Sequence, residues 1–295
     1  MSAADVAFAL GKSRREGRRW RCLCPLHGGH SLTLADSTNG KLLFTCWAGC
    51  DRRDLVAEFR RRNFIAGTAN ARQSPAERTT TDNDRRVARA VAIWQNAGDP
   101  GGTVVEEYLA TRALKLPPEL RGRVIRFHRA CPWRNKQTDK IDFIPAMIVA
   151  FTSTTGDEVT AIHRIRLDRP QCWPRTERMM LGVTAGAAIK LDAIGDGKLA
   201  IGEGLETALA ARELGFAPVW ALGSATQIEK FRPIAGIEQL TILGETDQAN
   251  LQATERCAQV WIGERRRVFV AMPANGVKDF NDLLIKRTGN ENGQA

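Results

Sequence analysis

Four residues near the N-terminus have the types and the spacing of a zinc site. Cys24 and His27 are separated by two residues, and Cys46 and Cys50 by three. Between the pairs lie two strand-like runs, SLTLAD and KLLFTC, joined by the turn STNG. A tetrahedral Zn²⁺ takes four sulfur or nitrogen donors, and a hairpin brings two such pairs together at little cost in chain entropy. The pattern predicts a structural zinc ribbon.

Two nearby residues are alternative ligands of the same site. Cys22 is separated from Cys24 by a single residue, and His30 follows His27 closely. Cys24 is favoured as the first ligand because Pro25 and the two-residue step to His27 form a compact knuckle. The choice between Cys22 and Cys24 is open at this stage.

Acidic residues follow the strand-like segments of the C-terminal part of the chain. Glu203 comes after the apolar run LAI and lies between Gly202 and Gly204, before a helical pattern begins. Flanking glycines free the backbone to approach a ligand. The other acids that follow strand-like runs are Glu245, Asp247, Asp279 and Asp282.

The elements around these acids predict that they gather in one place. From Lys198 onward strand and helix signals alternate, which is typical of a three-layer α/β unit with a mainly parallel sheet. Sites in such sheets lie at the carboxyl ends of the strands. Clustered carboxylates repel one another unless a cation lies among them, and a few oxygen ligands suit Mg²⁺ shared with phosphates. This predicts a divalent-metal site for phosphoryl or nucleotidyl transfer.

The chain is basic, and much of the excess charge lies near the N-terminus. Of 295 residues, 43 are Lys or Arg and 33 are Asp or Glu, which gives a net charge of +10. Trp20 and Arg21 lie there in the run RRWR. Such aromatic and cationic side chains stack bases and neutralise phosphates along a single strand, so we expect both to bind single-stranded nucleic acid. Packing of Trp20 in the small ribbon core is the alternative.

No segment of the sequence predicts a membrane span or an export signal. The longest apolar stretch, IPAMIVAF, has only eight residues. Four of the seven cysteines crowd into residues 22–50, which favours metal binding over disulfides. We therefore expect a cytoplasmic protein with no membrane partner.

Composition and periodicity divide the chain into five parts. The run AGTANARQSPAERTTTDND is small, polar and aperiodic, which indicates a linker. The predicted fold is multidomain, combining α+β and α/β parts. These are a zinc ribbon (1–63), a linker (64–84), a basic α+β middle region (85–192), an α/β domain with a mainly parallel sheet (193–286) and a disordered tail (287–295).

Several motifs together resemble a known family. CPLH followed by FTCWAGC resembles the zinc-binding domain of bacterial DnaG-type primases. AIGEGLETALAA, ILGETD and KDFNDLL are similar to the three motifs of a Toprim domain. Residues 161–192 resemble the segment that leads into that domain in primase-like proteins of phages, plasmids and other mobile elements. The order of the parts is more specific than any single motif.

The resemblance implies a role for each acid. Glu203 matches the family's glutamate, a general acid or base or a metal ligand, and Asp247 matches the second acid of its Asp-x-Asp metal motif. Glu245 stands at the first position of that motif, so this ligand is longer by one methylene group. Asp279 and Asp282 lie in the third motif. The implied ligands of a catalytic Mg²⁺ or Mn²⁺ are Glu203, Glu245 and Asp247.

The resemblance also implies partners and an activity. Three arginines fall where related primases bind nucleotide or template: Arg164, Arg166 and Arg178. The implied function is a DNA primase, which makes short RNA primers on single-stranded DNA from nucleoside triphosphates. No motor motif follows residue 286, so we expect any replicative helicase partner to be a separate chain.

Two other functions fit the same residues. A Toprim nuclease would use the same carboxylates to cleave DNA, and the departure at Glu245 suggests a non-catalytic subunit that binds single-stranded DNA. The sequence leaves open the template start sequence, the primer length, the choice between ribo- and deoxynucleotides and the oligomeric state. It also leaves open whether the Glu245 form of the motif is catalytically competent.

Overall fold

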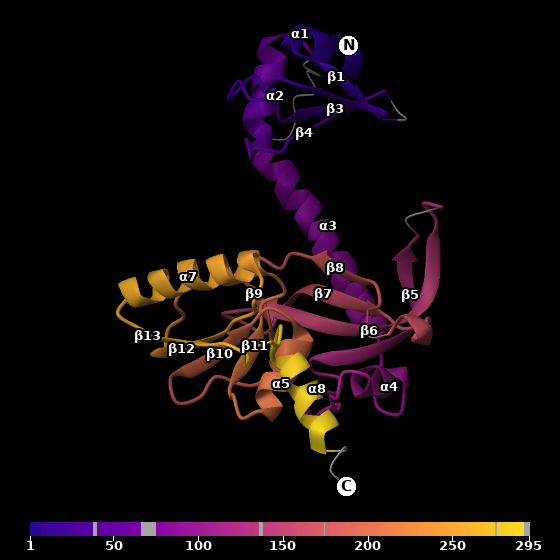
Figure 1. Ribbon diagram of the computed structural model, residues 1–295. Helices are drawn as coiled ribbons and strands as arrows, with labels where there is room; N and C mark the ends of the chain where they lie inside the picture. The colour runs from indigo at the N-terminus through magenta and orange to yellow at the C-terminus, as the bar shows by residue number, and fades with distance from the viewer. Residues whose placement is uncertain (38–39, 66–74, 136–137, 174, 275, 292–295) are drawn as a thin grey trace. The chain divides into compact units, whose positions relative to one another are not determined.

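The computed structural model describes the chain outside residues 38–39, 66–74, 136–137, 174, 275 and 292–295. The chain forms two compact units, Met1–Gln73 and Ser74–Ala295 (Figure 1). Among the described residues, no helix combines the length and the apolar content needed to cross a membrane.

The N-terminal unit is a small antiparallel sheet with two helices packed on it. Ser2 and Asp51 cap these helices, because their side chains accept the backbone N–H groups of Asp5 and Arg53. The sheet has the strand order β1-β2-β3-β4. The elements are α1 (Ala3–Leu10), β1 (Arg14–Glu16), β2 (Arg19–Cys22), β3 (Leu32–Asp36), β4 (Leu42–Cys46) and α2 (Arg52–Arg61).

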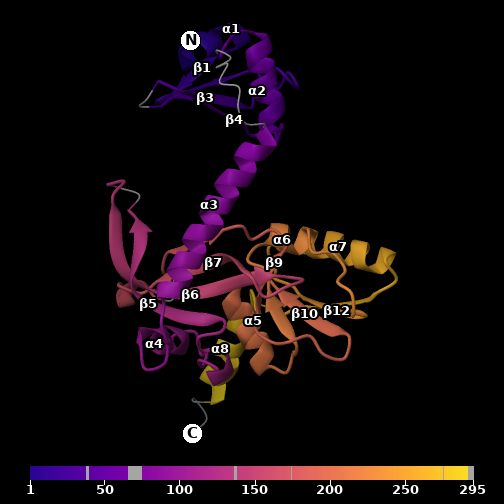
Figure 2. The ribbon, with the colours of Figure 1, turned by 180° about the vertical axis from the view of Figure 1, so that it is seen from behind.

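A single mixed sheet of nine strands runs through the larger unit (Figures 1 and 2). Its order is β13-β12-β10-β11-β9-β6-β7-β8, and β5 pairs with β6. Strands β10 to β13 pair in parallel with one another, and the other pairs are antiparallel. The strands are β5 (Ile125–Arg134), β6 (Ile141–Ser153), β7 (Val159–Arg166), β8 (Arg178–Gly182), β9 (Ala187–Lys190), β10 (Lys198–Gly202), β11 (Val219–Ala221), β12 (Gln239–Leu243) and β13 (Arg267–Ala271).

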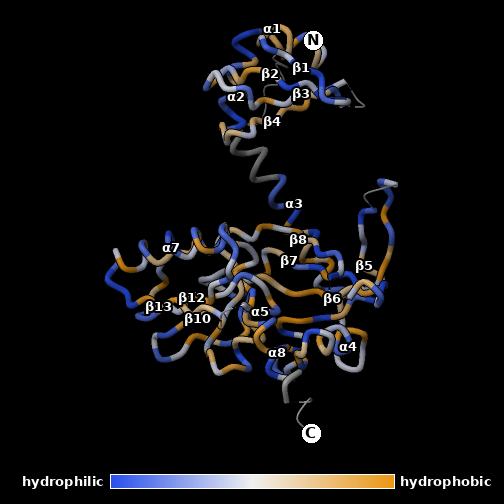
Figure 3. Tube along the Cα trace, in the orientation of Figure 1, coloured by the Kyte–Doolittle hydropathy of each residue, from blue (hydrophilic) through white to orange (hydrophobic). Residues whose placement is uncertain are grey.

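Helices cover both faces of the parallel part of this sheet. On one face lie α6 (Ala225–Glu229) and α7 (Gln248–Gly263), and on the other α5 (Leu205–Glu213) and α8 (Phe280–Glu291) (Figures 1 and 2). Burial from both sides explains why β10 and β11 are apolar runs. Figure 3 shows hydrophilic and hydrophobic residues alternating along α7, as expected for a helix with one buried face.

The remaining helices pack on the antiparallel part. Ala90 and Trp94 of α3 (Pro75–Asn96) share a core with Ile148 and Ile162. The short elements are α4 (Val104–Ala110) and the 3₁₀ turns η1 (Pro118–Leu120) and η2 (Pro170–Cys172).

Two helices extend past the predicted boundaries. Helix α3 begins at Pro75, so the later part of the predicted linker 64–84 is helical, while 66–74 lie outside the described residues. Proline suits the first turn of a helix. The run TTTDND that follows has low helix propensity, which is why the sequence did not predict a helix that begins at Pro75. Helix α8 continues to Glu291, into the predicted tail 287–295, of which 292–295 lie outside the described residues.

The predicted fold class is confirmed, and its two larger parts share one sheet. Strand β9, from the predicted middle region 85–192, pairs with β6 of that region and with β11 of the predicted α/β domain 193–286. Residues of both parts also fill one apolar core, for example Met147, Val149, Leu205 and Leu209. The two parts therefore form one compact unit.

A polar triad centred on a buried carboxylate also joins them. Tyr108 Oη on α4 donates to Glu206 Oε1 on α5 at 2.7 Å, and Arg178 Nη2 on β8 donates to the same oxygen at 2.9 Å. Burial acts to raise the pKa of the Glu206 carboxyl, but the Arg178 charge and the Tyr108 hydroxyl outweigh it and hold this pKa below its ordinary value. Glu206 is therefore an ionised, compensated group at the centre of the unit.

Substitution Tyr108→Phe tests the contribution of this triad to stability. Phenylalanine keeps the ring but removes the hydroxyl, which leaves the buried carboxylate with one partner fewer. We expect the free energy of unfolding of the larger unit to fall by about 2 kcal/mol. Urea denaturation followed by tryptophan fluorescence measures it, because five of the seven tryptophans lie in that unit. An unchanged midpoint would contradict the role given to the hydroxyl.

Candidate functional site

The four residues predicted to bind zinc lie together in the N-terminal unit. The ligand atoms of Cys24, His27, Cys46 and Cys50 are all within 4.8 Å of one another. Cys24 Sγ and Cys50 Sγ are 3.8 Å apart, and sulfurs bound at about 2.3 Å to one tetrahedral Zn²⁺ lie about 3.8 Å apart. Ser31, which the sequence did not single out, places its Oγ 2.9 Å from His27 Nε2 and 3.3 Å from Cys46 Sγ. The cluster fits a structural zinc ion.

The alternative ligands are held elsewhere. Cys22 lies on β2 without exposed surface, and burial raises the pKa of its thiol to about 11. His30 Nε2 contacts the backbone carbonyl of Lys12. Neither belongs to the cluster, so the geometry favours Cys24 over Cys22.

The five predicted acids lie at the carboxyl ends of three neighbouring parallel strands. Glu203 directly follows β10, and Glu245 and Asp247 lie between β12 and α7. Asp279 precedes α8, which follows β13, and Asp282 lies in the first turn of that helix. Because β12 pairs in parallel with both β10 and β13, all three strands end at the same edge of the sheet.

Asn250, which the sequence analysis missed, joins the loops that carry these acids. Its Nδ2 donates to Glu203 Oε2 at 3.0 Å, and its Oδ1 accepts the backbone N–H of Glu245 at 2.9 Å. The Asn250 side chain has no exposed surface. Its only sequence signal is the position three residues after Asp247, where an N-cap meets its partner. One buried amide thus holds Glu203 and Glu245 in a common arrangement.

Glu245 lies in an electrostatically unfavourable place. Its side chain is buried, and burial together with the negative charges of Glu203 and Asp279 raises its pKa to about 7. Lys278 Nζ opposes this shift from 4.0 Å away. Thr207 Oγ1 is 3.4 Å from Glu245 Oε1. A cation among these carboxylates would relieve the repulsion, and such oxygens are the ligands that Mg²⁺ and Mn²⁺ prefer.

The aspartates also organise the adjoining helices. Asp247 Oδ1 accepts the N–H of Asn250 at 3.0 Å and caps α7. Asp279 Oδ1 accepts the N–H of Asp282 at 2.9 Å at the start of α8. In each carboxylate one oxygen makes the cap, so a metal ligand and a helix cap are compatible roles for the same residue.

The glycines around Glu203 differ from their expected role. Neither Gly202 nor Gly204 has a positive φ, and Gly204 is the N-cap of α5. The positive φ is found instead at Gly223, after the neighbouring strand β11, where φ is +89°. The N–H of Gly223 donates to the Glu203 carbonyl at 2.7 Å. An added Cβ there would lie 2.7 Å from Phe151, so this position requires glycine.

Two of the three predicted arginines are occupied by structural contacts. Arg166 is 6% exposed and forms ion pairs with Asp168 and Glu177. Arg164 is 9% exposed, donates to the Pro132 carbonyl and lies over the Trp133 ring. Arg178 is more accessible and belongs to the Glu206 triad, and Glu206 follows Glu203 by three residues in the chain. The sequence analysis could not separate these cases, because a buried and an exposed arginine look alike in a basic segment.

Trp20 and Arg21 lie on β2 in the N-terminal unit. The Trp20 ring is half-buried and packs against Phe8, with ring centroids 5.1 Å apart. Arg21 Nε is 3.6 Å from Glu16 Oε2. Trp20 therefore has a packing role and retains exposed surface beside the arginines of this strand.

Family comparisons identify two segments of the chain. Residues 198–291 match the Toprim domain, and the predicted Toprim domain is therefore confirmed. Residues 84–191 match a domain of unknown function (DUF7146). No curated protein matches the chain in sequence.

Solved primase structures are similar to the chain at low sequence identity. The Aquifex aeolicus primase, with its zinc-binding and RNA polymerase domains, matches at 14% identity and TM-score 0.42, over 100% of this chain and 82% of that one. A Pseudomonas aeruginosa DNA primase domain matches at 14% and 0.46, over 68% and 74%. The primase fragment of the bacteriophage T7 primase-helicase protein matches at 18% and 0.38, over 53% of this chain and 64% of the fragment.

The zinc cluster predicts opposite behaviour for two neighbouring cysteines. Cys46→Ala removes one of four ligands, so the purified protein should contain no zinc, whereas wild type should contain one ion per chain. Cys22→Ala, outside the cluster, should keep the full zinc content. Zinc is measured by atomic absorption on the full-length chain. Loss of zinc in Cys22→Ala with retention in Cys46→Ala would overturn the assignment.

The buried acid predicts a pH-dependent stability. With a pKa of about 7 in the folded state and 4.5 unfolded, folded Glu245 binds the proton more tightly, so stability falls as pH rises between these values. Without added divalent cations, Glu245→Gln should be more stable than wild type at pH 8, by on the order of 2 kcal/mol, and equal to it near pH 4.5. Urea denaturation at both pH values measures this.

Glu255→Gln is the matched control, because Glu255 is an exposed residue of α7. It should follow wild type at both pH values. A Glu245→Gln protein that is no more stable than wild type at pH 8 would show that the carboxylate is not under repulsion.

Proposed function

We propose that this chain, whose C-terminal part is a Toprim domain, is a DNA primase that makes short RNA primers on single-stranded DNA by metal-dependent nucleotidyl transfer. The observation that carries the proposal is the pairing of Glu203 and Glu245 through Asn250, at the carboxyl edge of parallel strands. The Cys24–His27–Cys46–Cys50 cluster in the same chain also supports it.

The reaction makes one bond and breaks another. The 3′-hydroxyl oxygen of one nucleotide attacks the α-phosphorus of a second nucleoside triphosphate, pyrophosphate leaves, and the hydroxyl proton passes to a base. A divalent cation, when bound, neutralises the charge of the phosphates and holds them in line for attack. The acids must therefore bind the cation and orient it, and one of them must be able to take the proton.

Glu203 is suited to the central role. Its Oε2 accepts the Asn250 amide, so among the described residues Oε1 is the oxygen left for a proton or a cation. Glu245 and Asp247 would complete the cation site, with Asp279 and Asp282 beside it. The longer Glu245 side chain is compatible with this role, because Thr207 and the Asn250-bound backbone hold its position.

The N-terminal unit would bind the template. Trp20 offers a partly exposed ring for a base, and Arg21 and its neighbours on β2 offer positive charge to the phosphates. A zinc-stabilised sheet keeps these side chains on one rigid element. Arg178, half-buried beside the Toprim strands, is the predicted arginine best placed to meet a triphosphate.

Primer synthesis by Glu203→Gln tests the proposal. Wild type, given a mixed single-stranded DNA template, labelled nucleoside triphosphates and Mg²⁺ or Mn²⁺, should produce short labelled products. The variant should lose about a hundredfold or more of this activity, because the amide neither takes a proton nor carries charge. Glu255→Gln should retain it.

The same assay separates the alternatives. Template degradation that depends on Glu203, without triphosphate incorporation, would replace the primase by a nuclease. Template binding without turnover under either metal would leave a DNA-binding subunit. Full primer synthesis by Glu203→Gln would overturn the role given to this carboxylate.

A further inference from the structure

Strand β13 is an edge of the nine-stranded sheet. It stands at one end of the strand order, and among the described residues only β12 pairs with it (Figure 1). Such an edge presents a row of backbone N–H and C=O groups, and soluble proteins protect it with charged side chains, proline or a covering element. From Val268 to Met272 the chain has neither a charged residue nor a proline.

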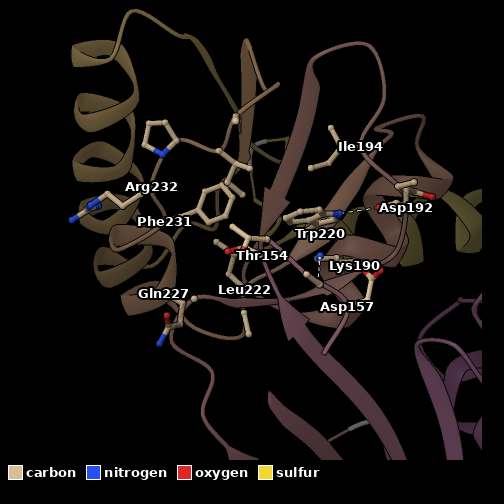
Figure 4. A pocket seen from close by; sticks show the side chains of 18 of the residues that line it. Thr154, Asp157, Lys190, Asp192, Ile194, Trp220, Leu222, Gln227, Phe231 and Arg232 are labelled. Atoms are coloured by element: carbon tan, nitrogen blue, oxygen red, sulfur yellow. Dashed lines mark hydrogen bonds between the residues drawn. The ribbon is translucent and has the colours of Figure 1, made fainter. Parts of the chain in front are cut away.

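The large apolar side chains of β13 are exposed, unlike those of the inner strands. Phe269 is 53% and Val270 is 47% exposed, and Met272, directly after the strand, is 43% exposed. By contrast, Trp220 of β11 is 2% exposed, and Figure 4 shows its indole N–H bonded to the Asp192 carbonyl. Exposed apolar surface along a strand edge is typical of an interaction site.

The side chains of β13 alternate between the two faces of the sheet. Val268 and Val270 pair with two residues of β12 that lie in the core beneath α6 and α7, Leu240 and Ile242. Phe269 therefore points to the opposite face. Helices α5 and α8 cover the inner strands on that face but leave the Phe269 ring half exposed. This ring lies at the centre of an uncovered strand.

The backbone of β13 determines which of its residues are free to pair with a new strand. The N–H of Arg267 donates to the Glu238 carbonyl at 3.0 Å, and the carbonyl of Ala271 accepts the Gly244 N–H at 2.9 Å. Both bonds run toward β12, and successive residues of a strand direct their backbone groups to opposite sides. The backbone groups of the two valines between them therefore point to the open edge.

This edge is complementary to a second copy of itself. When two copies of β13 lie antiparallel with Phe269 opposite Phe269, Val268 of each lies opposite Val270 of the other, and the backbone groups of the valines form the ladder. The two phenylalanines then form a non-hydrogen-bonded pair, in which side chains lie closer than in a bonded pair. One contact thus covers exposed apolar residues of both chains.

The amino end of β13 carries an excess of positive charge. Residues 265–267 are three arginines, and the acids beside them are Glu264 and Glu238. Glu238 forms an ion pair with Arg266. Arg265 and Arg267 are exposed, so this end has two further cations for one further acid.

The carboxyl end of β13 is negative. The Ala271 carbonyl bonds to the residue that precedes Glu245, so the loop with Glu245 and Asp247 begins beside the end of this strand. Lys278 is a cation close to Glu245, and the other acids of the site lie at the same edge. In the antiparallel pair Arg267 of each copy lies opposite Ala271 of the other. Unlike charges therefore meet at both ends of the contact.

We propose that the larger unit binds a second copy of this chain through β13, as a two-fold dimer with antiparallel strands and Phe269 on the axis. This symmetric contact joins the two nine-stranded sheets into one continuous sheet. It uses none of the catalytic chemistry, so it does not rest on the primase proposal. An edge that stays free, or one that receives a different protein, contradicts it.

Sedimentation equilibrium of the full-length chain tests the proposal. At tens of micromolar, wild type should have twice the 32.5 kDa mass of one chain. Phe269→Lys removes the aromatic pair and places two like charges opposite each other, so it should weaken association at least about tenfold. Phe143→Lys is the matched control, because Phe143 is exposed on β6 of the same sheet, and it should associate as wild type.

Two results would overturn the dimer. The first is a wild-type protein that remains a single chain at this concentration, which would leave the edge for another occupant. The second is association of Phe269→Lys as strong as that of wild type, which would place the contact between copies elsewhere.

Cysteine cross-linking tests the register of the two strands. In a Cys172→Ser background, which removes an exposed cysteine, Phe269→Cys should form a disulfide-linked dimer in air, because a residue on the axis meets its own counterpart. Arg267→Cys is the matched control and should stay unlinked, because it lies opposite Ala271. Non-reducing electrophoresis measures both. Linking through Arg267→Cys, or none through Phe269→Cys, would overturn the pairing about Phe269.

Discussion

The arrangement of the carboxyl edge depends on the buried amide of Asn250. A neutral side-chain amide offers a donor and an acceptor on one rigid plane, and here the donor meets the Glu203 carboxylate while the acceptor meets the Glu245 backbone. Two loops that follow different strands are thereby held at a fixed spacing. Asp247 caps the same helix turn through the Asn250 N–H, so the third acid is tied to the first two. A small change at this one position would therefore move several carboxylates together.

Two buried glutamates of the larger unit have opposite electrostatic environments. Glu206 is paired with Arg178 and Tyr108, and its charge is stabilised in place. Glu245 follows the neighbouring strand β12. Burial and the nearby carboxylates raise its pKa to about 7, although Lys278 lies 4.0 Å away. The first arrangement supports the fold, whereas the second costs stability unless a cation is present. A buried carboxylate that is repelled by its neighbours is typical of a site prepared for a ligand.

Sequence reasoning succeeded where local spacing determines the structure. The zinc ligands and the strands that lead to the acids follow from spacing and hydrophobic runs, and the structure brings both sets together. It failed where partners are distant in the chain. Asn250 meets Glu203 from 47 residues away, and Tyr108 meets Glu206 from 98. The burial of Arg164 and Arg166 follows from how β7 is covered, which a basic segment does not reveal.

The antiparallel pairing of β9 with β11 limits how this chain can be divided in evolution or in the laboratory. The segments on either side of Asp192 match separate families, yet both contribute strands to one shared sheet. Cutting between them would uncover a row of backbone donors and acceptors on β9 and another on β11, and exposed edges of that kind pair with other chains. The Toprim segment therefore cannot be separated from the preceding segment without exposing strand edges. A recombinant protein that exchanges the Toprim segment should therefore include β9. A fragment that begins at Lys198 would leave β11 as an unpaired edge strand, which favours aggregation.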